Sequence, residues 1–252
     1  MEILPPAEPS LQPLPRLQPS WDVADLVAFG TFFFLTLAFL PAVLVLIARV
    51  FISGLSATNL SAVAQILLQG VLDIVWVGFI FFLVRVIHRK NILEAFPWQN
   101  THRYRLTSLV ILGGILAIMV IGVSSYFPPS SPPAVEKLTE SSRSVILLVT
   151  FSVCFAPIIE EIIFRGFLFS VLSEIGGSRL AIPATAVLFG LMHAPQLWPS
   201  VAGILLILGV GIVLSIVRER SNSLIPSFIV HTAYNGMLVG ITAIGTLLQK
   251  GK

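Results

Sequence analysis

The chain has 252 residues, of which 56% are hydrophobic and 11% charged, and its net charge is +3. Soluble domains carry roughly 25% charged residues, so this composition excludes a soluble globular protein. Apolar runs of about 20 residues recur along nearly the whole chain, which also excludes a soluble enzyme with one membrane anchor. The sequence therefore predicts an all-α, polytopic helical membrane protein. Its basic residues gather at the ends of the apolar runs, so we expect a lipid bilayer and no nucleic acid as partner.

Two regions differ in composition. Residues 1–25 are rich in proline, which predicts a poorly ordered N-terminal tail, and residues 26–252 form the membrane domain. A loop rich in Lys and Arg between the second and third apolar runs predicts a cytoplasmic N-terminus for this integral, multi-pass protein. Two lysines at the C-terminus leave an eighth, re-entrant or split segment open. We expect seven transmembrane helices, at about 26–52, 62–87, 106–126, 144–171, 180–193, 201–217 and 224–248, with Pro195 ending the fifth.

Three charged residues interrupt the fourth apolar run. Glu160 and Glu161 are adjacent, and Arg165 follows four residues after Glu161. In a helix Glu161 and Arg165 lie on one face and can form a charge-assisted hydrogen bond. Glu160 is rotated from that pair by about 100° and is left to face another part of the fold. A carboxylate without a cationic partner suits a general base, whereas the alternative is a set of charges capping a helix at the membrane surface.

Two further pairs of side chains with i,i+4 spacing lie in apolar runs. Phe189 and His193 form one pair, and His231 and Asn235 form the other. With a rise of about 1.5 Å per residue, Glu160, His193 and Asn235 each lie roughly 20 Å from the predicted cytoplasmic ends of their helices, and His231 about 13 Å. Polar groups at a similar depth on three helices can face one common cavity.

A glutamate, two histidines and an asparagine are sufficient to hydrolyse an amide bond. Glu160, assisted by His193, could deprotonate a water, while His231 and Asn235 could donate hydrogen bonds to the oxyanion. The same residues allow a second mechanism, in which Glu160, His193 and His231 bind zinc and leave one position open for water. No His-Glu-x-x-His segment supports a zinc site by its spacing, so the metal-free route is preferred and no cofactor is assigned.

One more charge lies inside an apolar run. Asp73 falls within the second predicted span, where an ionisable residue is costly and is a candidate for function. No other charge lies within several helical turns of it along the chain. We therefore interpret Asp73 as a polar contact between helices.

The three motifs, in this order, resemble those of the CPBP family, which contains the type II CAAX prenyl endopeptidases and the bacterial Abi, or bacteriocin-immunity, proteins. The motifs are Glu-Glu-x-x-x-Arg at 160–165, Phe-x-x-x-His at 189–193 and His-x-x-x-Asn at 231–235. The resemblance implies an intramembrane endopeptidase in which Glu160 and His193 activate water and His231 and Asn235 stabilise the oxyanion. It implies supporting roles for Glu161, Arg165 and Phe189. It leaves open whether the enzyme is of the glutamate or the metallo type.

The leading hypothesis is an intramembrane peptidase whose catalytic core spans about residues 135–248. Its expected partner is a membrane-embedded or lipid-modified peptide substrate, and the resemblance extends this to prenylated CAAX-type proteins. The main alternative is a non-catalytic membrane immunity or scaffold protein whose polar residues hold helices together. A transporter is a third hypothesis, because charges near the midplane also mark ion paths.

Overall fold

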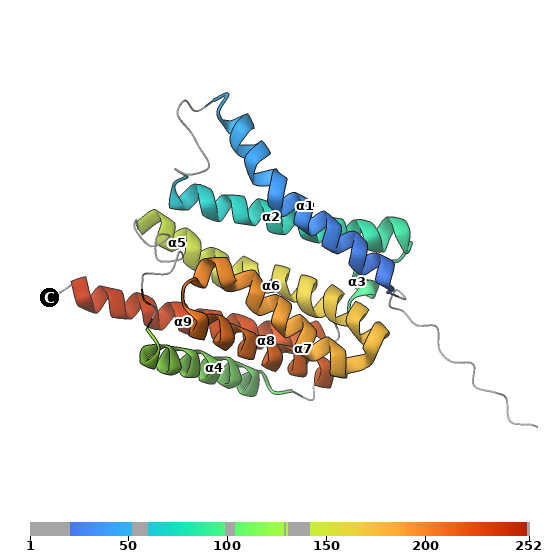
Figure 1. The fold of residues 1–252 in the computed structure, drawn as a ribbon. Helices are drawn as coiled ribbons and strands as arrows, with labels where there is room; N and C mark the ends of the chain where they lie inside the picture. The colour runs from blue at the N-terminus through green and yellow to red at the C-terminus, as the bar shows by residue number, and fades with distance from the viewer. Residues whose placement is uncertain (1–20, 52–59, 99–103, 129, 131–141, 251–252) are drawn as a thin grey trace, which may run out of the picture.

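The computed structural model describes residues 21–51, 60–98, 104–128, 130 and 142–250, so residues 1–20 of the expected Pro-rich tail lie outside the described part. Every regular element within these ranges is a helix, which confirms the all-α fold class (Figure 1). The helices are α1 Val23–Ala48, α2 Ala62–Phe82 continued by η1 Leu83–Ile87, α3 Ile92–Ala95, α4 Leu106–Tyr126, α5 Ser142–Thr150, η3 Phe151–Phe155, α6 Ala156–Glu160, η4 Glu161–Leu168, α7 Phe169–Leu197, α8 Val201–Ser221 and α9 Leu224–Lys250.

The described helices contain six segments that are long and apolar enough to cross a membrane. One of them, Arg143–Leu197, has 55 residues, whereas a bilayer needs only about 20. Its backbone leaves helical geometry at Gly176 and Gly177, so this segment is long enough to cross the membrane twice, which would give seven spans among the described helices. The protein is therefore an integral, multi-pass membrane protein. The prediction that Pro195 ends the fifth span is wrong, because α7 continues to Leu197.

Local sequence explains where several helices begin and end. Asp22 accepts a hydrogen bond from the backbone N–H of Asp25 at 3.0 Å, and Asp25 accepts one in return from Asp22, so α1 starts at a capping box. α8 ends at Asn222, whose left-handed backbone (φ 49°) terminates the helix. Gly177 has φ 68°, a conformation that glycine adopts without steric cost, and it reverses the chain between the two halves of α7.

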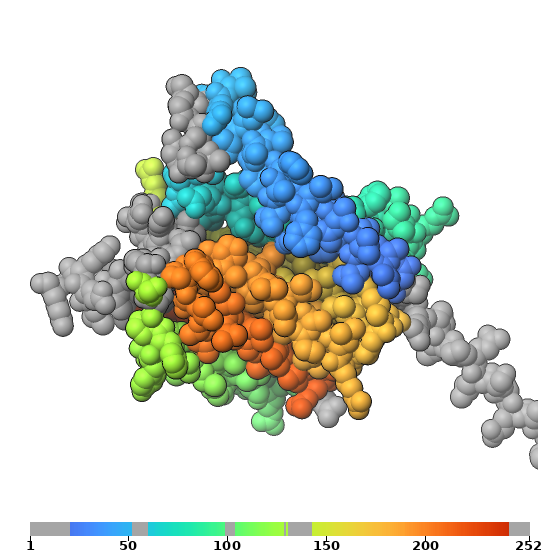
Figure 2. Space-filling model, in the orientation of Figure 1, coloured from blue at the N-terminus to red at the C-terminus, as the bar shows by residue number. Residues whose placement is uncertain are grey.

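The segment that carries the predicted site lies at the centre of the bundle. All eight residues of η4 are buried, and η4 contacts α2, α7 and α9. The pairs α7–α8 and α4–α9 make the most extensive helix contacts on one side of η4 (Figure 1). α1 and α2 lie on the other side, and the second half of α1 extends away from the remaining helices (Figure 2). The site is therefore enclosed by protein, while α1 is exposed over most of its surface.

The fourth span departs from α-helical geometry around the predicted site. Both η3 and η4 are π-helical, and they flank the short α6. Pro157 at the start of α6 has no N–H to donate, which interrupts the regular hydrogen-bond ladder. π-Helical turns inside α-helices are frequent at functional sites. The prediction of a plain α-helix at Glu160–Arg165 is therefore corrected to a π-helix from Glu161 onward.

Packing of α4 against α9 generates the first prediction. A methyl group at Gly113 would lie 2.5 Å from the carbonyl oxygen of Val230, so Gly113→Ala forces the two backbones apart. We expect it to lower the free energy of unfolding by about 1–3 kcal/mol, measured by thermal unfolding in detergent. Gly114→Ala is the matched control, since a methyl group there meets no neighbour within 4 Å. Equal stability of the two variants would contradict this packing.

Candidate active site

An ion pair between Glu161 and Arg165 forms the base of the candidate site. Arg165 Nη1 lies 3.1 Å from Glu161 Oε1, and both side chains are almost completely excluded from solvent. Arg165 Nη2 also donates to the carbonyl oxygen of Gly211 at 3.2 Å. The guanidinium carbon lies 4.5 Å from the ring centroid of Phe189, a cation–π distance. These contacts compensate the positive charge where no water can hydrate it.

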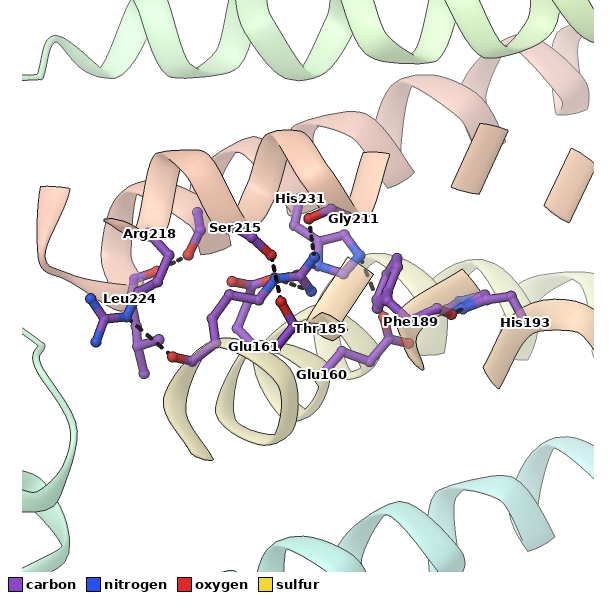
Figure 3. Close-up of polar contacts among 12 residues, drawn as sticks. Glu160, Glu161, Thr185, Phe189, His193, Gly211, Ser215, Arg218, Leu224 and His231 are labelled. Atoms are coloured by element: carbon purple, nitrogen blue, oxygen red, sulfur yellow. Dashed lines mark hydrogen bonds and ion pairs between the residues drawn. The ribbon is translucent and has the colours of Figure 1, made fainter. Parts of the chain in front are cut away.

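His231 joins both glutamates. Its Nδ1 lies 3.0 Å from Glu161 Oε1, and its Nε2 lies 3.5 Å from Glu160 Oε2 (Figure 3). Because a carboxylate only accepts hydrogen bonds, the proton of the first contact belongs to Nδ1. Glu161 thereby fixes the orientation of the imidazole and directs Nε2 towards Glu160. The two acids differ in exposure, since the side chain of Glu160 is 18% exposed and that of Glu161 is 1% exposed.

Phe189 lies between the two histidines. Its ring centroid is 4.6 Å from that of His193 and 5.7 Å from that of His231. His193 Nδ1 hydrogen-bonds with the carbonyl oxygen of Phe189 at 2.9 Å, which leaves Nε2 as the nitrogen that can face a ligand. The contacts described for His193 do not include one to Glu160. The structure thus brings His193 to the edge of the site through Phe189 (Figure 3).

Asn235 connects α9 to the segment that precedes the glutamates. Its Nδ2 donates to the carbonyl oxygen of Ser152 in η3 at 2.7 Å. This carbonyl lies within a π-helical turn, where the regular bonding pattern is disturbed. Asn235 therefore lies one turn beyond His231 on α9 and holds η3 against that helix, while the contacts described for it do not reach Glu160.

The proposed zinc ligands do not form a converging set. Among the side chains that the structure describes, no three His, Cys, Asp or Glu residues are grouped so that they could hold a metal ion. Both ring nitrogens of His231 face carboxylates, and Nδ1 of His193 faces a backbone carbonyl. Glu160, His193 and His231 therefore do not fit a three-ligand zinc site in this arrangement.

Sequence reasoning missed two residues that support the site. Arg218 is 4% exposed, and its Nε donates to the carbonyl oxygen of Arg165 at 3.1 Å. Its Nη1 also donates to Asn222 Oδ1 at 3.3 Å, an i,i+4 contact whose spacing is visible in the sequence. Gly211 was missed because its role is played by a backbone carbonyl, and no side-chain pattern reveals that. Both residues lie on α8 and hold it against η4.

The second prediction concerns the buried ion pair. Glu161→Gln leaves the guanidinium of Arg165 buried without a compensating negative charge, so we expect the free energy of unfolding to fall by about 3–5 kcal/mol. Glu160→Gln is the control, because Glu160 is more exposed and the close ion pair of Arg165 is with Glu161. Thermal unfolding in one detergent compares them. A Glu161→Gln protein as stable as the Glu160→Gln protein would contradict the assigned pairing.

Comparison with known proteins places these residues in a family. Residues 142–237 match the family model described as Type II CAAX prenyl endopeptidase Rce1-like. No curated protein matches the chain, and neither does any solved structure. The matched segment contains every expected site residue from Glu160 to Asn235, and it confirms the resemblance drawn from the three motifs. This part of the chain is therefore similar to the type II CAAX prenyl endopeptidases.

Proposed function

We propose that the protein is an intramembrane endopeptidase that hydrolyses a peptide bond of a membrane-associated protein, with prenylated CAAX-type proteins as the substrate class. The observation that carries the proposal is the buried cluster of Glu160, Glu161, Arg165 and His231 within the family-matched segment. Such a cluster is costly inside a bilayer, and a polar reaction is a reason to maintain it. The basic loop after the second span orients the N-terminus towards the cytoplasm, where lipid-modified proteins approach.

In the proposed mechanism Glu160 is the general base, assisted by His193. Glu160 is the more exposed of the two acids, so a water molecule can reach it, whereas Glu161 is enclosed by Arg165 and His231. Glu160 takes a proton from the water as its oxygen attacks the carbonyl carbon of the substrate. His193, with Nδ1 bound to its own helix, presents Nε2 to orient that water. The proton passes to the leaving nitrogen when the C–N bond breaks.

His231 and Asn235 stabilise the oxyanion that forms at the carbonyl oxygen. With Nδ1 held by Glu161, the ring directs Nε2 towards the reacting carbonyl, and this nitrogen donates a hydrogen bond to the oxyanion when it carries a proton. Asn235 uses one N–H for Ser152 and has a second N–H available. Donors fixed before the reaction lower the barrier because they need not reorganise as charge develops.

The third prediction is peptide cleavage. Purified protein in detergent or nanodiscs should cleave a fluorogenic, lipid-modified CAAX-type peptide, and Glu160→Gln or His193→Ala should lower kcat by about 10²–10⁴-fold because water activation is lost. Melting temperatures near wild type show that the variants are folded. Cleavage that chelator abolishes and zinc restores would contradict the metal-free mechanism. Absence of cleavage of any lipidated or transmembrane peptide would favour an immunity or scaffold role, and ion flux without cleavage a transporter.

The fourth prediction separates transition-state stabilisation from substrate binding. Asn235→Ala removes an oxyanion donor, so we expect kcat to fall by about 10²–10³-fold while KM changes little. Thr36→Val is the control, since it also removes a partly buried hydrogen bond between two helices, the one that Thr36 Oγ1 accepts from Trp76 Nε1 at 2.8 Å. Steady-state kinetics on the same peptide measures both. A change confined to KM for Asn235→Ala would refute its oxyanion role.

A further inference from the structure

A cavity of about 300 Å³ lies where the first half of α7 meets the end of α8. Its inner wall is formed by side chains that are buried, those of Phe169, Ser170 and Arg218. Its opening is lined by side chains that are exposed, those of Glu174, Glu219 and Asn222. None of these residues belongs to the set proposed for peptide hydrolysis, so the cavity is a second candidate site.

Arg218 gives the inner wall of this cavity a positive charge. The side chain donates from Nε to the carbonyl oxygen of Arg165 and from Nη1 to Oδ1 of Asn222, and both acceptors are uncharged. A guanidinium carries five N–H donors, so these two bonds leave N–H groups on both terminal nitrogens. Figure 3 shows the guanidinium at the end of the polar cluster opposite His193. The inner wall therefore offers donors to an anionic group, and a guanidinium suits the oxygens of a phosphate.

The cavity lies at the depth of the lipid headgroups. α8 is an apolar helix of 21 residues, and its basic residues, Arg218 and Arg220, lie in its last turn. Because about 20 residues cross the hydrocarbon core, this charged end lies at the boundary of the membrane. The first half of α7 ends at the same boundary, where Gly177 reverses the chain. The phosphate of a neighbouring lipid is thus an anion that can reach Arg218.

The opening of the cavity carries the opposite charge. The exposed carboxylates of Glu174 and Glu219 line it, and Glu219 also accepts a hydrogen bond from the hydroxyl of Ser178. The carbonyl ends of two helices meet here as well, and they add partial negative charge. These groups repel a free anion. They attract a ligand in which a cationic group follows the phosphate, because each charge then faces its opposite.

We propose that this cavity binds the headgroup of phosphatidylethanolamine. The phosphate accepts hydrogen bonds from Arg218, and the primary ammonium donates to the carboxylates of Glu174 and Glu219. The quaternary ammonium of phosphatidylcholine has no N–H to donate, and phosphatidylglycerol has no cationic group, so both bind more weakly. Because Arg218 also binds the backbone of Arg165, the bound lipid lies next to η4, the segment that carries Glu161 and Arg165.

The fifth prediction concerns lipid affinity, measured by native mass spectrometry of the purified full-length protein. The three lipids are supplied with identical acyl chains, and phosphatidylethanolamine should bind about 10-fold more tightly than the other two. Arg218→Gln should weaken its binding by about 10- to 100-fold, the effect of losing charged hydrogen bonds. Arg220→Gln is the matched control, since it removes an exposed charge from the same helix end without touching the cavity. It should bind phosphatidylethanolamine as the wild type does.

A second variant keeps the test decisive if Arg218→Gln does not fold, because Arg218 also holds α8 against η4. Glu219→Gln alters an exposed side chain, and it should reduce the preference for phosphatidylethanolamine over phosphatidylcholine by about 2- to 5-fold. An unchanged preference in Glu219→Gln, or equal wild-type affinity for the three lipids, would overturn the inference.

Inorganic phosphate distinguishes a lipid headgroup from a free anion as the ligand. Added at millimolar concentration, it should leave bound phosphatidylethanolamine in place, because the carboxylates at the opening repel it. Displacement of the lipid by phosphate would show a site for free anions and would overturn the lipid assignment. No peptide takes part in these measurements, so their outcome is independent of the proposed peptidase function.

Discussion

Neutralisation of charge inside an apolar bundle is the constraint on which the site depends. Glu160 and Glu161 bring two carboxyl groups into a membrane domain, and the guanidinium of Arg165 and the imidazole of His231 lie against them. An isolated charge buried in this way would cost several kcal/mol, whereas a paired and hydrogen-bonded set is tolerated. The rest of the structure serves this pairing. The carbonyl of Gly211 and the ring of Phe189 complete the surroundings of Arg165, and Arg218 binds the backbone behind it.

The pairing also gives the two adjacent acids different roles. Glu161 is enclosed by Arg165 and His231, so it maintains the fold and orients the imidazole. Glu160 keeps partial exposure and lies near Nε2, the other nitrogen of the same imidazole, so in the proposed mechanism it is the acid that a water molecule reaches. The two side chains point in different directions because adjacent residues are rotated about the helix axis, and this gives them different neighbours. In the proposed mechanism, a structural ion pair next to a reactive acid explains why this membrane protein carries two consecutive glutamates.

Hydropathy alone predicted much of the fold, because a bilayer permits few backbone structures besides helices of about 20 apolar residues. The i,i+4 spacing of Glu161 and Arg165 predicted their pairing, because residues four positions apart lie on the same face of a helix. Contacts between segments that are distant in the sequence were harder to predict. Glu161 and His231 are 70 positions apart, and no periodicity indicates which nitrogen of His231 faces which acid. The π-helix depends on how Pro157 and the packing of α2 shape the fourth span.

The central claim is that His231 lies between the two glutamates in the interior of the bundle. The most direct test is an experimental structure of the protein in lipid nanodiscs, at a resolution that defines side chains. The account predicts His231 Nδ1 within hydrogen-bond distance of Glu161, near the 3.0 Å seen here, and Nε2 near 3.5 Å from Glu160. An imidazole that faces lipid, or a Glu160 separated from it by another side chain, would contradict the account.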